Sequence, residues 1–150
     1  MIDLTAPIVP HKGIGIFNLD ASYDEIKALI RAKNIPHVEE TASPTDMNPP
    51  WTIIALRADG ARFESIELFF VEGRLFQICL SEDFKGALPN GIRLGMNIDA
   101  ARAIDERLRP RDDAEEIYES ADGYRLETFG RRREIVEITI FVESSVDTCP

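Results

Sequence analysis

The densest group of side chains that could do chemistry is an acidic run of Asp112, Asp113, Glu115 and Glu116. Paired carboxylates can transfer protons or bind divalent cations. The run lacks the Asp-x-Asp-x-Asp-Gly order and the terminal glutamate of a calcium loop. A solvated surface segment is the plainer interpretation. The functional alternative is that these carboxylates present negative charge to a basic protein partner and accelerate its encounter.

Other catalytic or metal-binding patterns are weak. The two histidines, His11 and His37, lie in expected loops, with no cysteine or second histidine at metal-ligand spacing. No Gly-x-Ser-x-Gly nucleophile motif occurs. Gly13 and Gly15 lack the third glycine and the basic residue of a phosphate-binding loop. We therefore predict no catalytic residue, no metal site and no cofactor, and we expect the protein not to be an enzyme.

The charge balance bears on the class of partner. The 150 residues include 17 Lys and Arg against 27 Asp and Glu, which gives a formal net charge of −10. Such an acid excess repels nucleic-acid phosphates and anionic lipid, so we expect neither partner. The one basic cluster, Arg131 to Arg133, is interpreted as a turn neutralised by Glu127 and Glu134.

The chain start and the cysteines indicate the compartment. Residues 1–7 show no basic segment followed by an apolar run, so they do not resemble a signal peptide. Cys79 and Cys149 are predicted to be free thiols. These features together predict a cytoplasmic protein.

Two similar segments divide the sequence into halves. Leu19 and Leu94, 75 residues apart, each open a helical pattern, and an Asp-Gly turn follows later in each half. Ser22 with Glu25 forms a capping box, and Asn97 is the expected cap of the second helix. We predict a single α+β domain of two tandem helix-plus-antiparallel-meander repeats, at about 8–85 and 86–145, with the helices on one face of the sheet. The first repeat should carry a loop insertion at 37–50.

The strand patterns predict which residues face outward. Ile, Val and Phe enrich segments 51–57, 62–71 and 75–80, with turns between them, and segment 62–71 changes parity, which requires a bulge or a break. The last strand places Val136, Ile138, Ile140 and Val142 on one face and Glu137 and Phe141 on the other. The outward set of aromatic, acidic and amide residues is Trp51, Glu67, Phe69, Gln77, Glu137 and Phe141.

Two short motifs resemble known families. Gly91-Ile92-Arg93-Leu94-Gly95-Met96, followed after four residues by Ala101, resembles the helix entry of the tandem helix-plus-hairpin proteins that include the β-lactamase inhibitor protein. Lys12-Gly13-Ile14-Gly15 is similar to the openings of small acidic immunity proteins of bacterial toxin systems. The resemblance implies a binding protein that inhibits a partner without chemistry of its own.

We therefore expect an immunity protein that occludes the active site of a cognate protein toxin, for which a basic toxin suits the acid excess. Its predicted contacts are the outward set and the acidic run. The alternative is a small-ligand-binding protein or enzyme that uses carboxylates between the two repeats. It predicts a deep pocket, whereas the inhibitor predicts a broad face.

Overall fold

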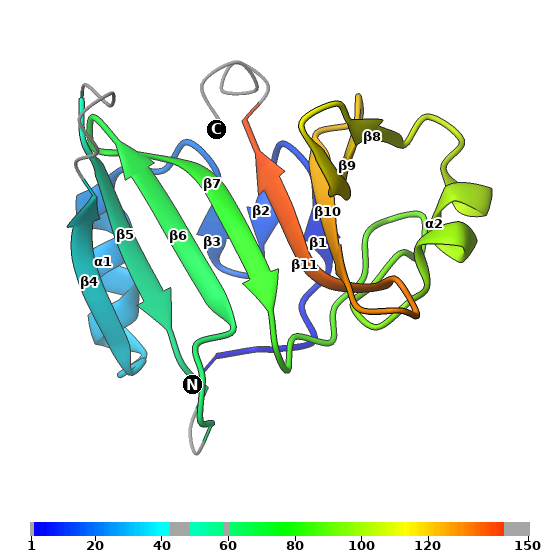
Figure 1. Cartoon of the computed structure of the whole chain (residues 1–150). Coiled ribbons are helices and arrows are strands. Elements are labelled where there is room, and N and C mark those ends of the chain that lie inside the picture. Colours follow the sequence, from blue (N-terminus) through cyan, green and yellow to red (C-terminus); the bar gives the residue numbers. More distant parts are fainter. Residues whose placement is uncertain (1, 43–48, 59–60, 143–150) are drawn as a thin grey trace.

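The computed structural model describes residues 2–42, 49–58 and 61–142, apart from the side chains of Ala42 and Glu115. A small three-stranded sheet of β1 (Ile8–Val9), β2 (Gly13–Ile14) and β3 (Phe17–Asn18) precedes helix α1 (Tyr23–Ala32). Four strands follow α1, then helix α2 (Ile98–Ile104), then four more strands (Figure 1). The predicted α+β class is confirmed.

Local sequence explains both helices. Ser22 caps α1 by accepting a hydrogen bond from the Glu25 amide at 3.2 Å, as the capping box predicts. Asn97 caps α2 through the Asp99 amide at 2.8 Å. Each cap residue also forms an isolated antiparallel bridge to a strand that follows its helix, Ser22 to Arg74 and Asn97 to Glu134. The start of each helix is thereby attached to the main sheet.

The main sheet has eight antiparallel strands in the order β4-β5-β6-β7-β11-β10-β9-β8. Its first four strands are β4 (His37–Ala42), β5 (Trp51–Leu56), β6 (Ile66–Val71) and β7 (Arg74–Ser81). The other four are β8 (Arg109–Arg111), β9 (Ala114–Ser120), β10 (Tyr124–Phe129) and β11 (Glu134–Phe141). β7 and β11 pair at the centre and join the two groups of four (Figure 1).

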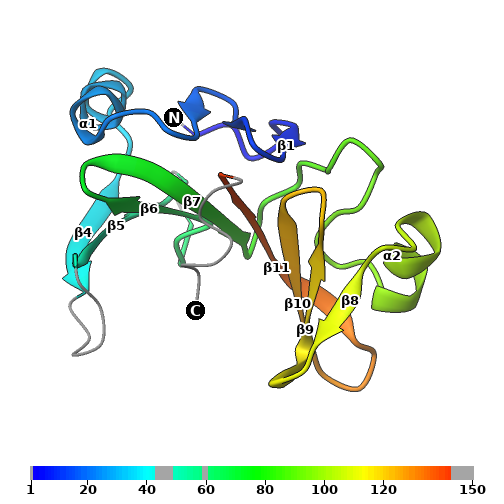
Figure 2. The same cartoon turned by 90° about the horizontal axis from the view of Figure 1, so that it is seen from above.

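One face of this sheet carries the hydrophobic core. Alternation along β6 places Ile66, Leu68 and Phe70 in the core, where neighbouring strands add further buried side chains. Both helices pack into the same core, α1 through Ile26 and Ile30 and α2 through Ile98 and Ala101. Figure 2 shows α1 and the small sheet on one side of the strands β4 to β7.

The predicted loop at 37–50 is wrong for its first six residues. They form β4, an edge strand paired with β5 from His37–Leu56 to Ala42–Trp51. An edge strand packs on one neighbour only, so a polar sequence carries little penalty there. The Tyr23 hydroxyl and the Lys27 ammonium on α1 both hydrogen-bond the Glu39 carboxylate. Residues 43–48 lie outside the described part.

The other strand predictions hold with two changes. Segment 62–71 breaks rather than bulges, because β6 starts at Ile66 and Phe63 lies 58% exposed before it. The β6–β7 register shifts between Phe69, which pairs with Gln77, and Phe70, which pairs with Leu75. A second shift in the β10–β11 pairing leaves Val136 41% exposed rather than in the core. Among the described residues, no helix has the length and apolarity to cross a membrane.

Candidate functional site

The candidate site is the face of the main sheet opposite the helices, which we call the open face. Residues that pair across neighbouring strands form rows on this face. One row is Ile53–Phe69–Gln77–Phe141, across β5, β6, β7 and β11. The next row runs Ala55–Glu67–Cys79–Thr139. Because alternate side chains point to opposite faces, these residues point away from the core side chains between them. The helices and the small sheet pack on the opposite face, and no other described helix or strand lies over the open face.

An aromatic cluster occupies one end of the open face. Trp51 packs against Phe76 with ring centroids 5.0 Å apart, and against Phe69 edge-on at 5.9 Å. Phe69 and Phe76 complete the cluster at 6.5 Å. Trp51 and Phe69 are partly exposed, whereas Phe76 is buried. Such partly exposed rings supply apolar area to a protein interface with little loss of side-chain entropy.

A polar centre lies beside this cluster, where β7 meets β11. The buried Cys79 thiol contacts the Thr139 hydroxyl at 3.3 Å and the Gln77 amide at 3.5 Å. Glu67 pairs directly with Cys79 across β6 and β7, and Glu137 lies two positions from Thr139 on β11. We call Glu67 and Glu137 the carboxylate pair. They come from opposite halves of the chain and flank the same thiol.

The surroundings raise the pKa of both carboxyl groups. For Glu67, partial burial is the main cause, and the negative charges of Glu40 and Glu64 add to it. For Glu137, partial burial again comes first, followed by the charges of Glu127 and Glu67, while Arg125 opposes the shift. Burial also raises the pKa of the Cys79 thiol, so it remains protonated at neutral pH. Cys79 is therefore an inert packing residue rather than a nucleophile.

Four of the six outward residues lie on the open face with accessible side chains: Trp51, Glu67, Phe69 and Glu137. Gln77 and Phe141 lie on the same face but are buried, at 3% and 4% exposed, so their prediction as contact residues is wrong. The cause is their position in the two central strands, where Gln77 lies between Phe69 and Phe141. Alternation along a strand predicts on which face of the sheet a side chain lies, but not how deeply it is buried.

The acidic run lies away from the aromatic cluster, at the turn and start of the β8–β9 hairpin. Asp112 and Glu116 are exposed, and Asp113 forms an ion pair with Arg111 at 3.0 Å. The side chain of Glu115 is outside the described part. Five strand spacings separate β9 from β5, or about 24 Å, so the run and Trp51 form separate surfaces.

The basic turn at Arg131 to Arg133 is neutralised in part. Arg133 donates to the Tyr118 hydroxyl at 3.0 Å and lies 3.5 Å from Asp99. Arg132 lies 4.0 Å from Glu134. Glu127 instead faces Glu137 across the β10–β11 pair.

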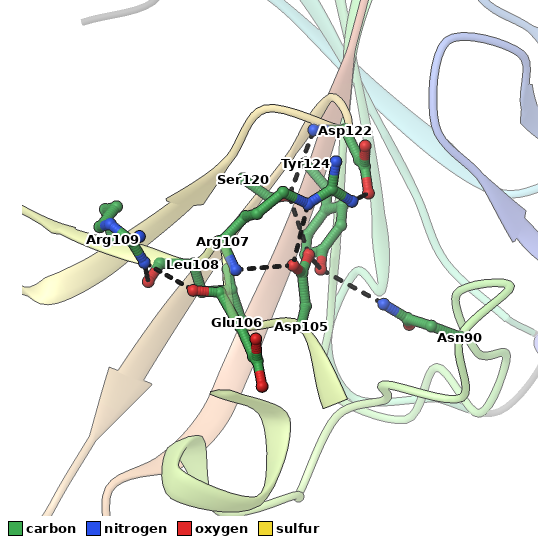
Figure 3. A network of polar contacts seen from close by, with 9 residues as sticks. All are labelled: Asn90, Asp105, Glu106, Arg107, Leu108, Arg109, Ser120, Asp122 and Tyr124. Carbon is green, nitrogen blue, oxygen red and sulfur yellow. Dashed lines mark hydrogen bonds and ion pairs between the residues drawn. The ribbon is translucent and has the colours of Figure 1, made fainter. Parts of the chain in front are cut away.

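A second polar network, which the sequence analysis missed, lies at the end of α2 (Figure 3). The buried Asp105 carboxylate accepts hydrogen bonds from the Tyr124 hydroxyl, from the Ser120 hydroxyl at 2.9 Å and from the Arg107 amide at 3.0 Å. Asn90 donates to the Tyr124 oxygen at 3.4 Å. Arg107 also pairs with Asp122. The network attaches α2 to β9 and β10.

The pKa values of Asp105 and Tyr124, the two central groups of this network, shift in opposite directions. Burial works to raise the pKa of Asp105, but the hydrogen bonds from Tyr124, Arg107 and Ser120 outweigh it and lower that pKa. Burial and the hydrogen bond to Asp105 raise the pKa of Tyr124 to about 12. Both pKa shifts favour an ionised Asp105 carboxylate and a protonated Tyr124 hydroxyl that donates a hydrogen bond to it. Because each group already has its partners, we assign this network to stability.

Comparison with known proteins identifies a similar fold but indicates no function. No family model matches the chain, and no curated protein sequence matches it. Among solved structures, the uncharacterized protein yfeY from Escherichia coli is similar, with a TM-score of 0.60 and 8% sequence identity. The alignment covers 90% of this chain and 99% of yfeY. The two proteins therefore share a fold over most of their length.

Proposed function

We propose that the protein binds a partner protein through the open face and inhibits it, as an immunity protein inhibits its cognate toxin. The observation that carries this proposal is the placement of partly exposed Trp51 and Phe69 beside the half-buried carboxylate pair. Aromatic anchors with a nearby set of charges are typical of protein interfaces. A basic partner suits this charge.

The duplicated layout favours a broad binding face. α1 is followed by β4 to β7 and α2 by β8 to β11, and each helix cap bridges to the last strand of its group. We interpret this as two repeats of a helix and a meander whose last strands meet at the centre. Both repeats would then contribute to one continuous surface, and occlusion of an active site needs no chemistry from the inhibitor itself.

The experiment is co-purification of the tagged full chain from its native cells, followed by measurement of stoichiometry and a growth assay. We expect one equimolar partner that arrests growth when expressed alone and is neutralised when co-expressed with this protein. The matched control is Trp51→Ala with Phe69→Ala, which should restore the growth arrest. A partner that is not toxic, or protection that survives both substitutions, would contradict the proposal.

A second candidate function is supported by the carboxylate pair itself. Glu67 and Glu137 come from different halves, and the pKa of each is raised, as a proton-transfer site between repeats would require. We propose this small-ligand or enzyme role as the alternative. It predicts that a small-molecule ligand raises the unfolding temperature and that the double substitution E67Q/E137Q abolishes this rise.

A further inference from the structure

Strand β4 is one of the two edges of the main sheet, and it lacks the protection that the other edge has. β4 ends the strand order, and the described residues place no further strand beyond it (Figure 1). At the opposite edge, β8 has three residues, contains Pro110 and shifts its register there. β4 has six residues, which pair with β5 one to one in a continuous register. Short strands, prolines and bulges hinder the pairing of an edge with other chains, so β8 is protected in this way and β4 is not.

The backbone of β4 offers hydrogen-bonding groups to a further strand. The Arg57 amide donates to the Pro36 carbonyl at 3.0 Å, directly before β4 begins. Hydrogen-bonded and non-hydrogen-bonded pairs alternate along antiparallel strands. The N–H and C=O groups of His37, Glu39 and Thr41 therefore point away from β5, to the side where the described residues place no strand. All residues from His37 to Thr41 are exposed.

The side chains of β4 indicate the chemistry of the strand that would pair there. Val38 and Glu40 lie on the open face, because they pair with Ala55 and Ile53. Val38 is 57% exposed, and the charge of Glu40 helps to raise the pKa of the nearby Glu67. A basic residue opposite Glu40 would offset this repulsion between carboxylates, and an apolar residue opposite Val38 would cover its side chain.

A second copy of this chain does not suit the same edge. Two antiparallel β4 strands related by a two-fold axis keep their faces only when a residue pairs with its own copy. The two registers that pair most of the strand are centred on Glu39 and on Glu40. Either register puts two equal carboxylates directly opposite each other, and like charges in that position destabilise strand pairing.

We propose that the β4 edge pairs with an extended segment of a partner protein as an antiparallel ninth strand, with a basic residue opposite Glu40 and an apolar residue opposite Val38. Addition of a strand to a sheet edge is a recurring mode of recognition, in which main-chain hydrogen bonds give affinity and alternate side chains give specificity. The segment has the order basic-x-apolar along its own direction. The inference goes beyond the proposed function, because it concerns the edge of the sheet and does not require a toxic partner.

The test uses a disulfide-cyclised β-hairpin peptide with the outer strand Thr-Arg-Thr-Val-Thr, since a preorganised strand loses less entropy on binding. Nuclear magnetic resonance titration of the full chain should give a Kd of about 1 mM. The amides of His37, Glu39 and Thr41 should become protected from hydrogen exchange. The same hairpin N-methylated at its central threonine loses one hydrogen bond and should bind at least about tenfold more weakly. Glutamate in place of its arginine should weaken binding at least about fivefold.

Thr41→Pro is the corresponding change in the protein. The Thr41 amide points away from β5, so proline removes a donor from the edge and leaves the β4–β5 pairing in place. This variant should bind the hairpin at least about tenfold more weakly, whereas Thr41→Val, which keeps the amide, should stay within about twofold. Unchanged amide signals outside β4 and β5 check that Thr41→Pro is folded.

Equal binding of the N-methylated and unmodified hairpins, or no protection of the three β4 amides, would overturn the inference. Equal weakening in Thr41→Pro and Thr41→Val would also overturn it, because the side chain rather than the amide would then decide affinity. Protection of the same amides in a dimer of the free chain would assign the edge to a second copy instead. Phe69→Ala should leave hairpin affinity unchanged, and a loss there would move the hairpin to the open face.

Discussion

Asp105→Ala should lower the free energy of unfolding by about 3 kcal/mol, the largest stability loss that we expect from a single polar substitution in this chain. The change leaves the Tyr124 and Ser120 hydroxyls without their shared acceptor in a buried place. It also frees the end of α2 from β9 and β10. Urea denaturation at neutral pH measures the loss directly.

The control for this substitution is Asp113→Ala. Asp113 also forms an ion pair, with Arg111, but its side chain is 70% exposed. Exposed pairs contribute little, so this variant should stay within about 0.5 kcal/mol of the wild type. Equal losses in the two variants would show that the network around Asp105 does not stabilise the fold.

The contribution of the same network to the free energy of unfolding depends on pH. The pKa of Asp105 is lowered in the folded state. The stability that its ionised carboxylate contributes is therefore fully present above the ordinary pKa of an aspartate and is lost as pH falls through the folded-state pKa. The pKa of Tyr124 is raised to about 12, so its contribution is complete below about pH 10 and is lost as pH rises towards 12. The stability difference between wild type and Asp105→Ala should therefore be level from about pH 5 to pH 9 and narrow on both sides.

Trp51→Ala and Phe69→Ala should each weaken partner binding by about 2 kcal/mol or more, which is roughly 30-fold in Kd. Each ring is partly exposed in the free chain and becomes buried in the proposed complex. Because the rings also contact each other and Phe76, each substitution should cost some stability, by about 1 kcal/mol per lost aromatic pair. Titration calorimetry below the melting temperature of each variant separates the two effects.

Ile104→Ala is the matched control for binding. Ile104 is 45% exposed and apolar, but it lies on α2, on the other side of the sheet from the open face. Its truncation should leave partner affinity unchanged. A loss in Ile104→Ala equal to that in Trp51→Ala would place the interface on the helix side.

Local sequence signals predicted the parts of the fold that depend on neighbouring residues. The Ser22 and Asn97 caps and the turn at Glu72 and Gly73 are as expected, and both turn residues have positive φ. Alternation placed Trp51, Glu67, Phe69 and Glu137 on one face because each strand has a core-facing side. These predictions needed no knowledge of distant contacts.

The errors arise where distant parts of the chain decide the outcome. Gln77 and Phe141 are buried because β7 and β11 are central strands, and the strand order was not evident from the sequence. β4 was missed because an edge strand tolerates polar residues. The Asp105 network joins residues 15 and 19 positions apart, and no local pattern marks an aspartate at a helix end as a shared acceptor.

The central claim is that the open face is the binding surface, and hydroxyl-radical footprinting of the free and partner-bound chain tests it most directly. Labelling of Trp51 and Phe69 should fall on complex formation, whereas labelling of Tyr23 on α1 should stay unchanged. Unchanged labelling of Trp51 and Phe69 together with protection of Tyr23 would contradict the account and move the interface to the helix side.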